Sequence, residues 1–246
     1  CIRYLGCVSH PIFKNKQKEY YMKYTFAQLL TEGVYDKGIF KAVFLFGGSG
    51  SGKSYIYNKH LKGLGLKVVN SDNAFELTLK KKNIDAKKLA DVPKDERDAW
   101  HLRARVTANM QMDAYIDSRL GLLIDGTGKD LPSVKNLVNL LEGLGYDCIG
   151  ILISTSLKTA LKRNRQRSRV LPDEIVQNIH KQVKSNSDKF VSIFKAGFYE
   201  INNDDGSTIA DDINLRQKIN AFINKKPNNK TAINWIETEL KNKKRI

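Results

Sequence analysis

A chain of 246 residues with 41% hydrophobic side chains can bury a substantial core, and α/β proteins of this length commonly form one main domain. Lys and Arg outnumber Asp and Glu by 42 to 26, which gives a net charge of +16. This charge favours phosphorylated or polyanionic partners and disfavours a protein with an acidic, solvated surface. Three cysteines without a CxxC pair argue against a disulfide framework or a zinc site, and the absence of a long apolar run argues against a membrane span, so we expect a soluble cytoplasmic protein.

Apolar segments rich in β-branched and aromatic residues alternate with helical patterns along the chain. Strands are predicted at 41–46, 66–70, 120–124, 148–154 and 197–202. Helices are predicted at 52–62, 73–82, 94–118, 131–143, 156–167, 173–187, 188–195, 208–224 and 230–243. This alternation predicts an α/β fold with a mainly parallel five-stranded sheet flanked by helices. We expect a core at 41–207, an N-terminal extension at 1–40 and a C-terminal helical element at 208–246.

A glycine-rich segment between the first strand and its helix fits the pattern G-x-x-x-x-G-K-[ST] in full. Its glycines allow successive N–H groups to point inward, and the helix N-terminus adds a positive dipole end. Lys53 is expected to reach the β- and γ-phosphates of ATP, and the Ser54 hydroxyl to bind the Mg²⁺ that bridges them. The alternative is a flexible loop. The predicted phosphate-binding residues are Gly47, Gly48, Ser49, Gly50, Ser51, Gly52, Lys53 and Ser54.

Two aspartates follow the second and third predicted strands, at the sheet edge where parallel α/β proteins bind ligands. Asp72 is predicted to be the general base that receives the proton of an acceptor hydroxyl. The alternative is that Asp72 caps the helix that follows it. Asp125 ends an apolar strand, as a Walker B carboxylate that holds magnesium through water would; the alternative is a turn residue.

An arginine-rich segment at 162–169 follows the fourth predicted strand. Arg163 and Arg167 are four residues apart, so they would share one face of a helix. This spacing predicts a lid whose guanidinium groups stabilise charge on the γ-phosphate and whose closure excludes water. The alternative is a solvated basic helix end that complements the helix dipole.

Together with Asn-Ser-Asp at 70–72 and Ile-Asp-Gly-Thr-Gly-Lys-Asp at 124–130, these motifs resemble zeta-toxin-like P-loop kinases over about residues 40–203. The related polynucleotide 5′-kinases are a second match, and the segment 161–175 is closer to them. The resemblance implies a nucleoside-monophosphate-kinase-like fold with ATP and Mg²⁺ as ligands. It also implies that zeta-type members' acceptors, UDP-N-acetyl sugars, are candidate substrates, and that a toxin would have an antitoxin partner.

Carried over by position, the resemblance implies a role for each motif residue. It implies that Asp72 is the base and that Lys53 and Ser54 bind ATP and magnesium. It also implies that Arg163 and Arg167 clamp phosphate. It also implies that the acceptor site contains Asp125, Thr127 and Lys129. Two departures bear on the acceptor: a lysine stands at 129 where zeta-type members tend to have arginine, and no arginine follows Asp72 as in a polynucleotide-end kinase.

We therefore predict an ATP-dependent kinase that transfers the γ-phosphoryl group to an acceptor hydroxyl of a small molecule. A first alternative is a polynucleotide or nucleotide 5′-kinase, for which the charge of +16 is the main support. A second alternative is a non-enzymatic ATP- and nucleic-acid-binding module, supported by the basic balance and the lysine-rich tail.

Overall fold

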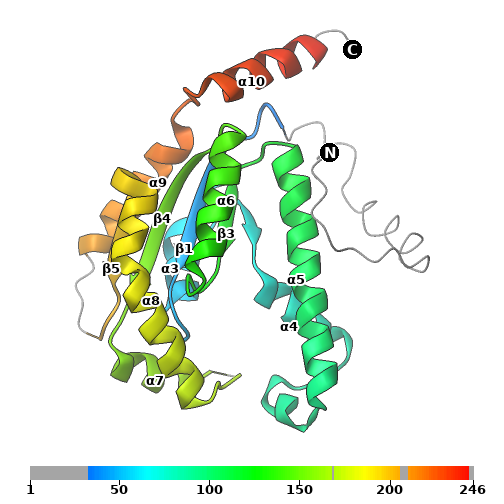
Figure 1. Cartoon of the computed structure of the whole chain (residues 1–246), viewed down its shortest axis with the longest axis vertical. Coiled ribbons are helices and arrows are strands. Elements are labelled where there is room, and N and C mark those ends of the chain that lie inside the picture. The colour runs from blue at the N-terminus through cyan, green and yellow to red at the C-terminus, as the bar shows by residue number, and fades with distance from the viewer. Residues whose placement is uncertain (1–32, 168, 206–209, 244–246) are drawn as a thin grey trace.

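Five apolar segments form one sheet in the computed structural model, which describes residues 33–167, 169–205 and 210–243 (Figure 1). The strands are β1 (Lys41–Phe46), β2 (Lys67–Val69), β3 (Leu122–Asp125), β4 (Asp147–Ser154) and β5 (Phe198–Asn202). Their order is β2-β3-β1-β4-β5, and every neighbouring pair is parallel. All six residues of the central strand β1 are buried. The prediction of an α/β fold with a five-stranded parallel sheet is confirmed.

Helices follow the strands in the predicted order, with one error. They are α3 (Lys53–Ile56), which continues into the π-helical turn η1 (Tyr57–Leu61), then α4 (Ser71–Lys81), α5 (Lys94–Asp117), α6 (Leu131–Gly143), α7 (Leu157–Arg165), α8 (Asp173–Phe194), α9 (Ala210–Asn224) and α10 (Lys230–Lys243). The prediction of separate helices at 173–187 and 188–195 is wrong, because α8 is continuous. Its buried positions Val183, Asn186, Phe190 and Phe194 are three or four residues apart and continue one helical face through the predicted break.

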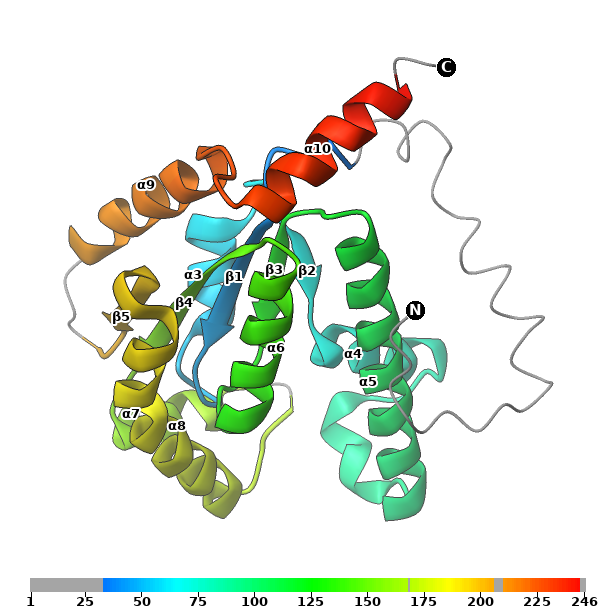
Figure 2. The same cartoon turned by 45° about the horizontal axis from the view of Figure 1, so that its top comes forward.

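The two faces of the sheet carry different helices (Figures 1 and 2). The larger cluster of buried side chains joins one face to α5, α6, α8 and α10, and Phe46 of β1 stacks on Phe190 of α8 with ring centroids 4.5 Å apart. A second cluster joins the other face to α3, η1 and α9 through residues such as Ile56, Leu61 and Ile219. Both clusters hold the carboxyl end of β1 in place, where the glycine-rich segment begins.

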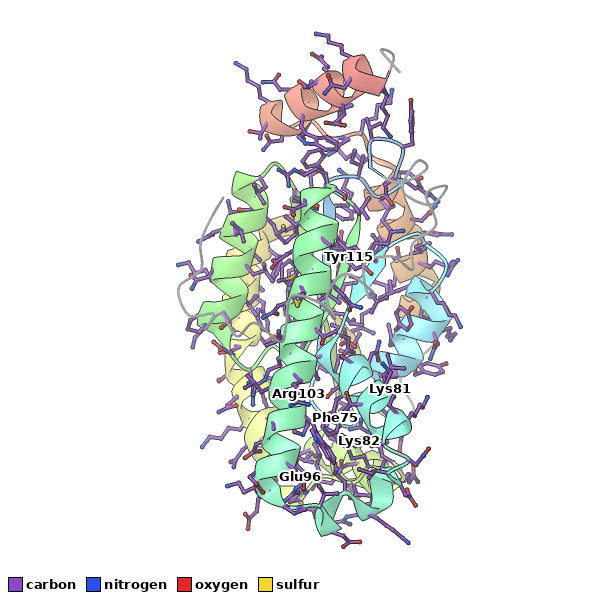
Figure 3. All side chains as sticks on the ribbon, turned by 90° about the vertical axis from the view of Figure 1, so that its right-hand side faces the viewer. Phe75, Lys81, Lys82, Glu96, Arg103 and Tyr115 are labelled. Atoms are coloured by element: carbon purple, nitrogen blue, oxygen red, sulfur yellow. The ribbon has the colours of Figure 1, made fainter. Side chains whose placement is uncertain are left out.

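A helical insert of residues 71–117 lies between β2 and β3 and contains α4, the 3₁₀ turn η2 (Ala86–Asp91) and α5. It has a small hydrophobic core of its own, formed by Phe75, Leu79, Trp100 and Ala104. Figure 3, which looks onto α5, shows Phe75 between α5 and α4. The insert and the pair α7 and α8 lie on opposite sides of the carboxyl end of the sheet (Figure 1).

Some sequence predictions concern parts of the chain outside the described ranges. Residues 1–32 of the predicted N-terminal extension, including Cys1 and Cys7, lie outside them. Cys148, in β4, has a free thiol and is partly buried. None of the helices in the described ranges is long and apolar enough to cross a membrane.

Candidate functional site

The glycine-rich segment makes its turn in a backbone conformation that favours glycine. Gly47, Gly50 and Gly52 have φ angles of 151°, 78° and 89°. A Cβ atom added at Gly50 would lie 2.2 Å from the carbonyl oxygen of Ala160 in α7, so the loop packs directly against that helix. The Ser51 hydroxyl is buried and has no hydrogen-bond partner in the described part of the chain. The loop thus has the shape of an anion-binding nest ahead of a helix N-terminus.

Lys53 lies at the centre of the site. Its Nζ donates a hydrogen bond to the carbonyl oxygen of Gly47 at 2.5 Å. Burial lowers the pKa of Lys53, and the carboxylates of Asp125 and Asp72 are close enough to oppose that shift. The structure therefore brings together the P-loop lysine and the two aspartates that the sequence places at strand ends.

Asn70, to which the sequence analysis gave no role of its own, connects the two aspartates. Its side-chain oxygen accepts a hydrogen bond from the backbone N–H of Asp72 at 2.7 Å, and its Nδ2 donates to Oδ2 of Asp125 at 2.5 Å. Asn70 is therefore the N-cap of α4, and the alternative that Asp72 caps this helix is wrong. Because α4 begins at Ser71, Asp72 lies in the first helical turn, where its side chain is 65% exposed.

Asp125 ends β3 with one carboxylate oxygen bonded and the other free of partners. Its Oδ1 is buried and has no hydrogen-bond partner among the residues that the structure describes. Burial raises the pKa of Asp125, and the positive charge of Lys53 opposes that shift. A hard oxygen in this setting suits Mg²⁺ or its water shell, and the Ser54 hydroxyl is exposed at the start of α3.

The described ranges contain no group of three or more His, Cys, Asp or Glu side chains that could hold a metal. A magnesium ion at this site would therefore be held by Ser54, by Asp125 directly or through water, and by the phosphates it accompanies. This is how Mg²⁺ is commonly bound, with few protein ligands and several waters. The residues present fit that arrangement.

The loop after β3 carries Thr127 and Lys129 at the carboxyl end of the sheet. The carbonyl oxygen of Thr127 accepts a hydrogen bond from the backbone N–H of Gly47 at 3.3 Å, which ties this loop to the glycine-rich one. Asn186 of α8 is buried and donates from Nδ2 to the carbonyl oxygens of Gly128 and Lys129, both at 3.0 Å. The backbone of the loop is thus fixed, whereas the Lys129 side chain is exposed.

The two predicted lid arginines contact different parts of the site. Arg163 donates to the carbonyl oxygen of Asn203 at 2.8 Å and forms an ion pair with Asp205 at 2.9 Å, both beyond the end of β5. Arg167 donates to the Ser49 hydroxyl of the glycine-rich loop at 2.7 Å. Because α7 ends at Arg165, Arg167 lies beyond the helix, and the prediction that the two arginines share one helical face is wrong.

A buried carboxamide joins the glycine-rich loop to the segment after α7. The Asn164 side chain is inaccessible to solvent, and its Oδ1 accepts hydrogen bonds from the Ser49 hydroxyl at 3.2 Å and from the Leu171 N–H at 3.3 Å. Its Nδ2 donates to the Leu171 carbonyl oxygen at 2.8 Å. Asn203 acts similarly on the other side of the loop, donating to the Ser51 carbonyl oxygen at 2.8 Å. Sequence reasoning missed both residues, since an isolated asparagine carries no pattern.

A glycine nest preceding a helix, a partly buried lysine and a strand-end carboxylate define a P-loop protein with a kinase-like fold that binds a nucleotide. Residues 43–188 match the family described as the AAA domain, and the chain belongs to this family. The P-loop kinase-like fold that the resemblance to zeta-toxin-like P-loop kinases implies is therefore confirmed, and this family match is consistent with the resemblance. No curated protein shows significant similarity to the whole sequence or a part of it.

Solved structures share the fold at low sequence identity. A chain of the PezAT chromosomal toxin–antitoxin system of Streptococcus pneumoniae is 20% identical with a TM-score of 0.52, and the match covers 78% of this chain and 79% of that one. A proposed kinase of Chloroflexus aurantiacus is 12% identical with a TM-score of 0.51, over 74% and 97% of the two chains. A chain of the AvrRxo1-ORF1:AvrRxo1-ORF2 complex with sulphate ions is 17% identical with a TM-score of 0.51, over 66% of this chain. The matched part spans only 54% of that longer relative.

Proposed function

We propose that this protein is an ATP-dependent kinase that transfers the γ-phosphoryl group of ATP to a hydroxyl group of a small-molecule acceptor. The observation that carries the proposal is the presence of two carboxylates, Asp72 and Asp125, near the P-loop lysine. A nucleotide-hydrolysing switch needs one such carboxylate for magnesium. A second one, on the side of the insert, supports the assignment of a base for an acceptor hydroxyl.

In this proposal each described side chain has one task. The backbone amides of residues 48–53 and the Lys53 ammonium bind the β- and γ-phosphates, and Ser54 and Asp125 hold Mg²⁺, which would supply neutralising charge. Arg167 leaves the Ser49 hydroxyl and turns to the γ-phosphate. The acceptor oxygen forms a bond to the γ-phosphorus as the bond to the bridging oxygen of ADP breaks, and Asp72 receives the acceptor proton.

Asn70 and Asn164 support these groups without touching substrate. Asn70 holds Asp125 through one end of its carboxamide and the first turn of α4 through the other. Asn164 holds the Ser49 hydroxyl at the glycine-rich loop. Arg163, paired with Asp205, keeps the end of β5 against the loop rather than clamping the γ-phosphate directly.

The acceptor that we favour is a UDP-N-acetyl sugar or a similar small molecule, bound near Thr127 and Lys129. The insert, where an acceptor would lie, has nine basic and nine acidic residues at 71–117, so it offers no net positive track for a polynucleotide. The fold shared with a toxin–antitoxin system supports the same class, with an antitoxin as partner. We also propose 41–207 as the catalytic core, with 1–40 and 208–246 as additions.

A polynucleotide or nucleotide 5′-kinase is the second candidate, and the charge of α7 and α8 favours it. Residues 157–195 contain ten Lys and Arg side chains against three Asp and Glu. Phosphate groups of an oligonucleotide that extends from the nucleotide site would contact the surface formed by α7 and α8. Such binding would weaken steeply as salt is raised.

The test is phosphoryl transfer from γ-labelled ATP to UDP-N-acetyl sugars, nucleosides and oligonucleotides with 5′-hydroxyl ends. We expect label in a small-molecule product; label in oligonucleotide ends alone would favour the second candidate. The variant Asp72→Asn should lower transfer by about 10²–10⁴-fold, the typical contribution of a general base, and leave ATP binding intact.

A matched control is Asp95→Asn, which removes an exposed carboxylate from the first turn of α5, on the same insert. Its transfer rate should stay within about twofold of the wild type, as surface changes usually do little. Full transfer by Asp72→Asn would refute the assignment of the base. ATP binding without transfer to any acceptor would instead favour the non-enzymatic module.

A further inference from the structure

Arg169, which lies in the segment between α7 and α8, contacts the insert on the opposite side of the carboxyl end of the sheet. Its Nη2 lies 3.8 Å from Oδ1 of Asp72, and its Cζ lies over the Phe75 ring at 5.1 Å from the centroid. The Arg169 side chain is 25% exposed. It therefore bridges two elements that are separated by almost a hundred residues in the chain.

The neighbouring arginines are occupied elsewhere. Arg163 is paired with Asp205, and Arg167 donates to Ser49. Arg165 pairs with Asp173 at the start of α8 and has a side chain that is 65% exposed. Among these four arginines, Arg169 is the one whose ion pair and ring contact reach the insert.

The surface that receives Arg169 is closely packed. Phe75 has no solvent exposure and stacks on His101 of α5, with ring centroids 3.8 Å apart and an interplanar angle of 3°. Both rings belong to helices that pack around the small core of the insert. A guanidinium group above such a ring gains cation–π attraction, and this contact restricts the conformations of the arginine side chain.

Asp72, by contrast, is a short side chain with a largely exposed carboxylate in a first helical turn. Nothing in its own turn holds the carboxylate, since Asn70 binds only its backbone N–H. The Asp72 carboxylate forms its ion pair with Arg169. Arg169 lies in the segment after α7, which also carries Arg167. A connected path runs from the Ser49 side chain through the Asn164 side chain to the backbone of Leu171, along the chain to Arg169, and through its side chain to Asp72.

We propose that Arg169 is a positioning residue for phosphoryl transfer, which holds the Asp72 carboxylate in place while its guanidinium group lies over the Phe75 ring. This inference rests on the proposed kinase function. Arg169 acts through Asp72 and not on the phosphates, and it links the segment after α7 to the element that carries the base. Acceptor activation therefore depends on the segment after α7 being in place.

The test compares Arg169→Gln and Arg169→Lys with the matched control Arg165→Gln. An exposed ion pair and a cation–π contact are each weak, so Arg169→Gln should lower kcat by about three- to tenfold while KM for ATP stays within about twofold. Arg169→Lys keeps the charge but loses the planar fit to the ring, so its kcat should be intermediate. Arg165→Gln should behave as the wild type.

A second measurement needs no activity: backbone hydrogen exchange of residues 71–75 in the protein without substrates. Exchange there should be faster in Arg169→Gln than in the wild type and unchanged in Arg165→Gln, because α4 has lost an anchor. A raised KM for ATP at unchanged kcat would overturn the proposal, since it would make Arg169 a phosphate ligand. Unchanged exchange would overturn it too. If the wild type transfers phosphate to no acceptor, the kinase function fails, and exchange still decides whether Arg169 orders α4.

Discussion

Replacing Asn164 by alanine tests whether the glycine-rich loop and the segment after α7 are held together by one buried side chain. The carboxamide makes three hydrogen bonds, one with the Ser49 hydroxyl and two with the backbone of Leu171. Each typical bond contributes about 1 kcal/mol, and a buried group left unsatisfied costs about 1–3 kcal/mol. We therefore expect Asn164→Ala to lower the free energy of unfolding by about 2–4 kcal/mol.

The loss should be visible in urea unfolding as a lower midpoint with an unchanged slope. For a chain of this size it corresponds to a fall in Tm of about 4–8 °C. Affinity for ATP should fall as well, because the Ser49 hydroxyl loses one of its two side-chain partners and keeps only Arg167. Asn178→Ala, at an exposed position of α8, is the control and should change stability by less than about 0.5 kcal/mol. A loss below about 1 kcal/mol for Asn164→Ala would refute the reasoning that the buried carboxamide holds the two segments.

Three further predictions concern residues at the carboxyl end of the sheet. Gly128 has φ 76°, and an added Cβ would lie 2.9 Å from a buried ring of α8, so Gly128→Ala should destabilise the fold by about 2–4 kcal/mol. Gly126→Ala, whose Cβ meets nothing within 4 Å, should cost less than about 1 kcal/mol; equal losses would argue against the packing of this loop. Burial raises the pKa of Asp125, so the folded state binds its proton more tightly than the unfolded state and stability falls as pH rises from 3.8 through the folded pKa. Asp125→Asn should therefore unfold at higher urea than the wild type at pH 7 without nucleotide, and a gain that does not shrink toward pH 4 would contradict this. Hydrogen bonds from Ser156 lower the pKa of Asp204, so its stabilisation is present above 3.8 and is lost as pH falls through the folded value. The loss of stability in Asp204→Ala should accordingly be greatest near neutral pH in thermal unfolding, and a loss that is constant with pH would exclude the ionised carboxylate as its cause.

The parts of the fold that could be predicted from sequence are those that depend on local pattern. The apolar runs that became β1 and β4 stand out because both strands are buried on both faces, and the glycine-rich segment has a spacing that few other structures require. Asp125 was found for the same reason, as the polar end of an apolar strand. In each case the physical cause of the local structure lies within one short stretch of sequence.

The parts that could not be predicted depend on contacts across the fold. Asn70, Asn164, Asn186 and Asn203 each fix a loop of the site through hydrogen bonds to residues distant in the chain or to a neighbouring helix start. An asparagine in a loop or helix carries no periodic signal that would distinguish such a role from solvation. The pairing of Arg163 and Arg167 failed because it assumed a helix that continues past Arg165.

The position of β1 in the middle of the sheet has a consequence for how the protein forms. Val43 pairs with Leu123 on one side and with Ile149 on the other, so the strand that leads into the nucleotide loop has no neighbour until the chain has been made through β3, and only one until it has been made through β4. Contacts this distant in sequence slow folding, because a long loop must close before they form. During synthesis the phosphate-binding loop will therefore be assembled late, and an apolar segment such as Val-Phe-Leu-Phe at 43–46 will need protection from aggregation until then.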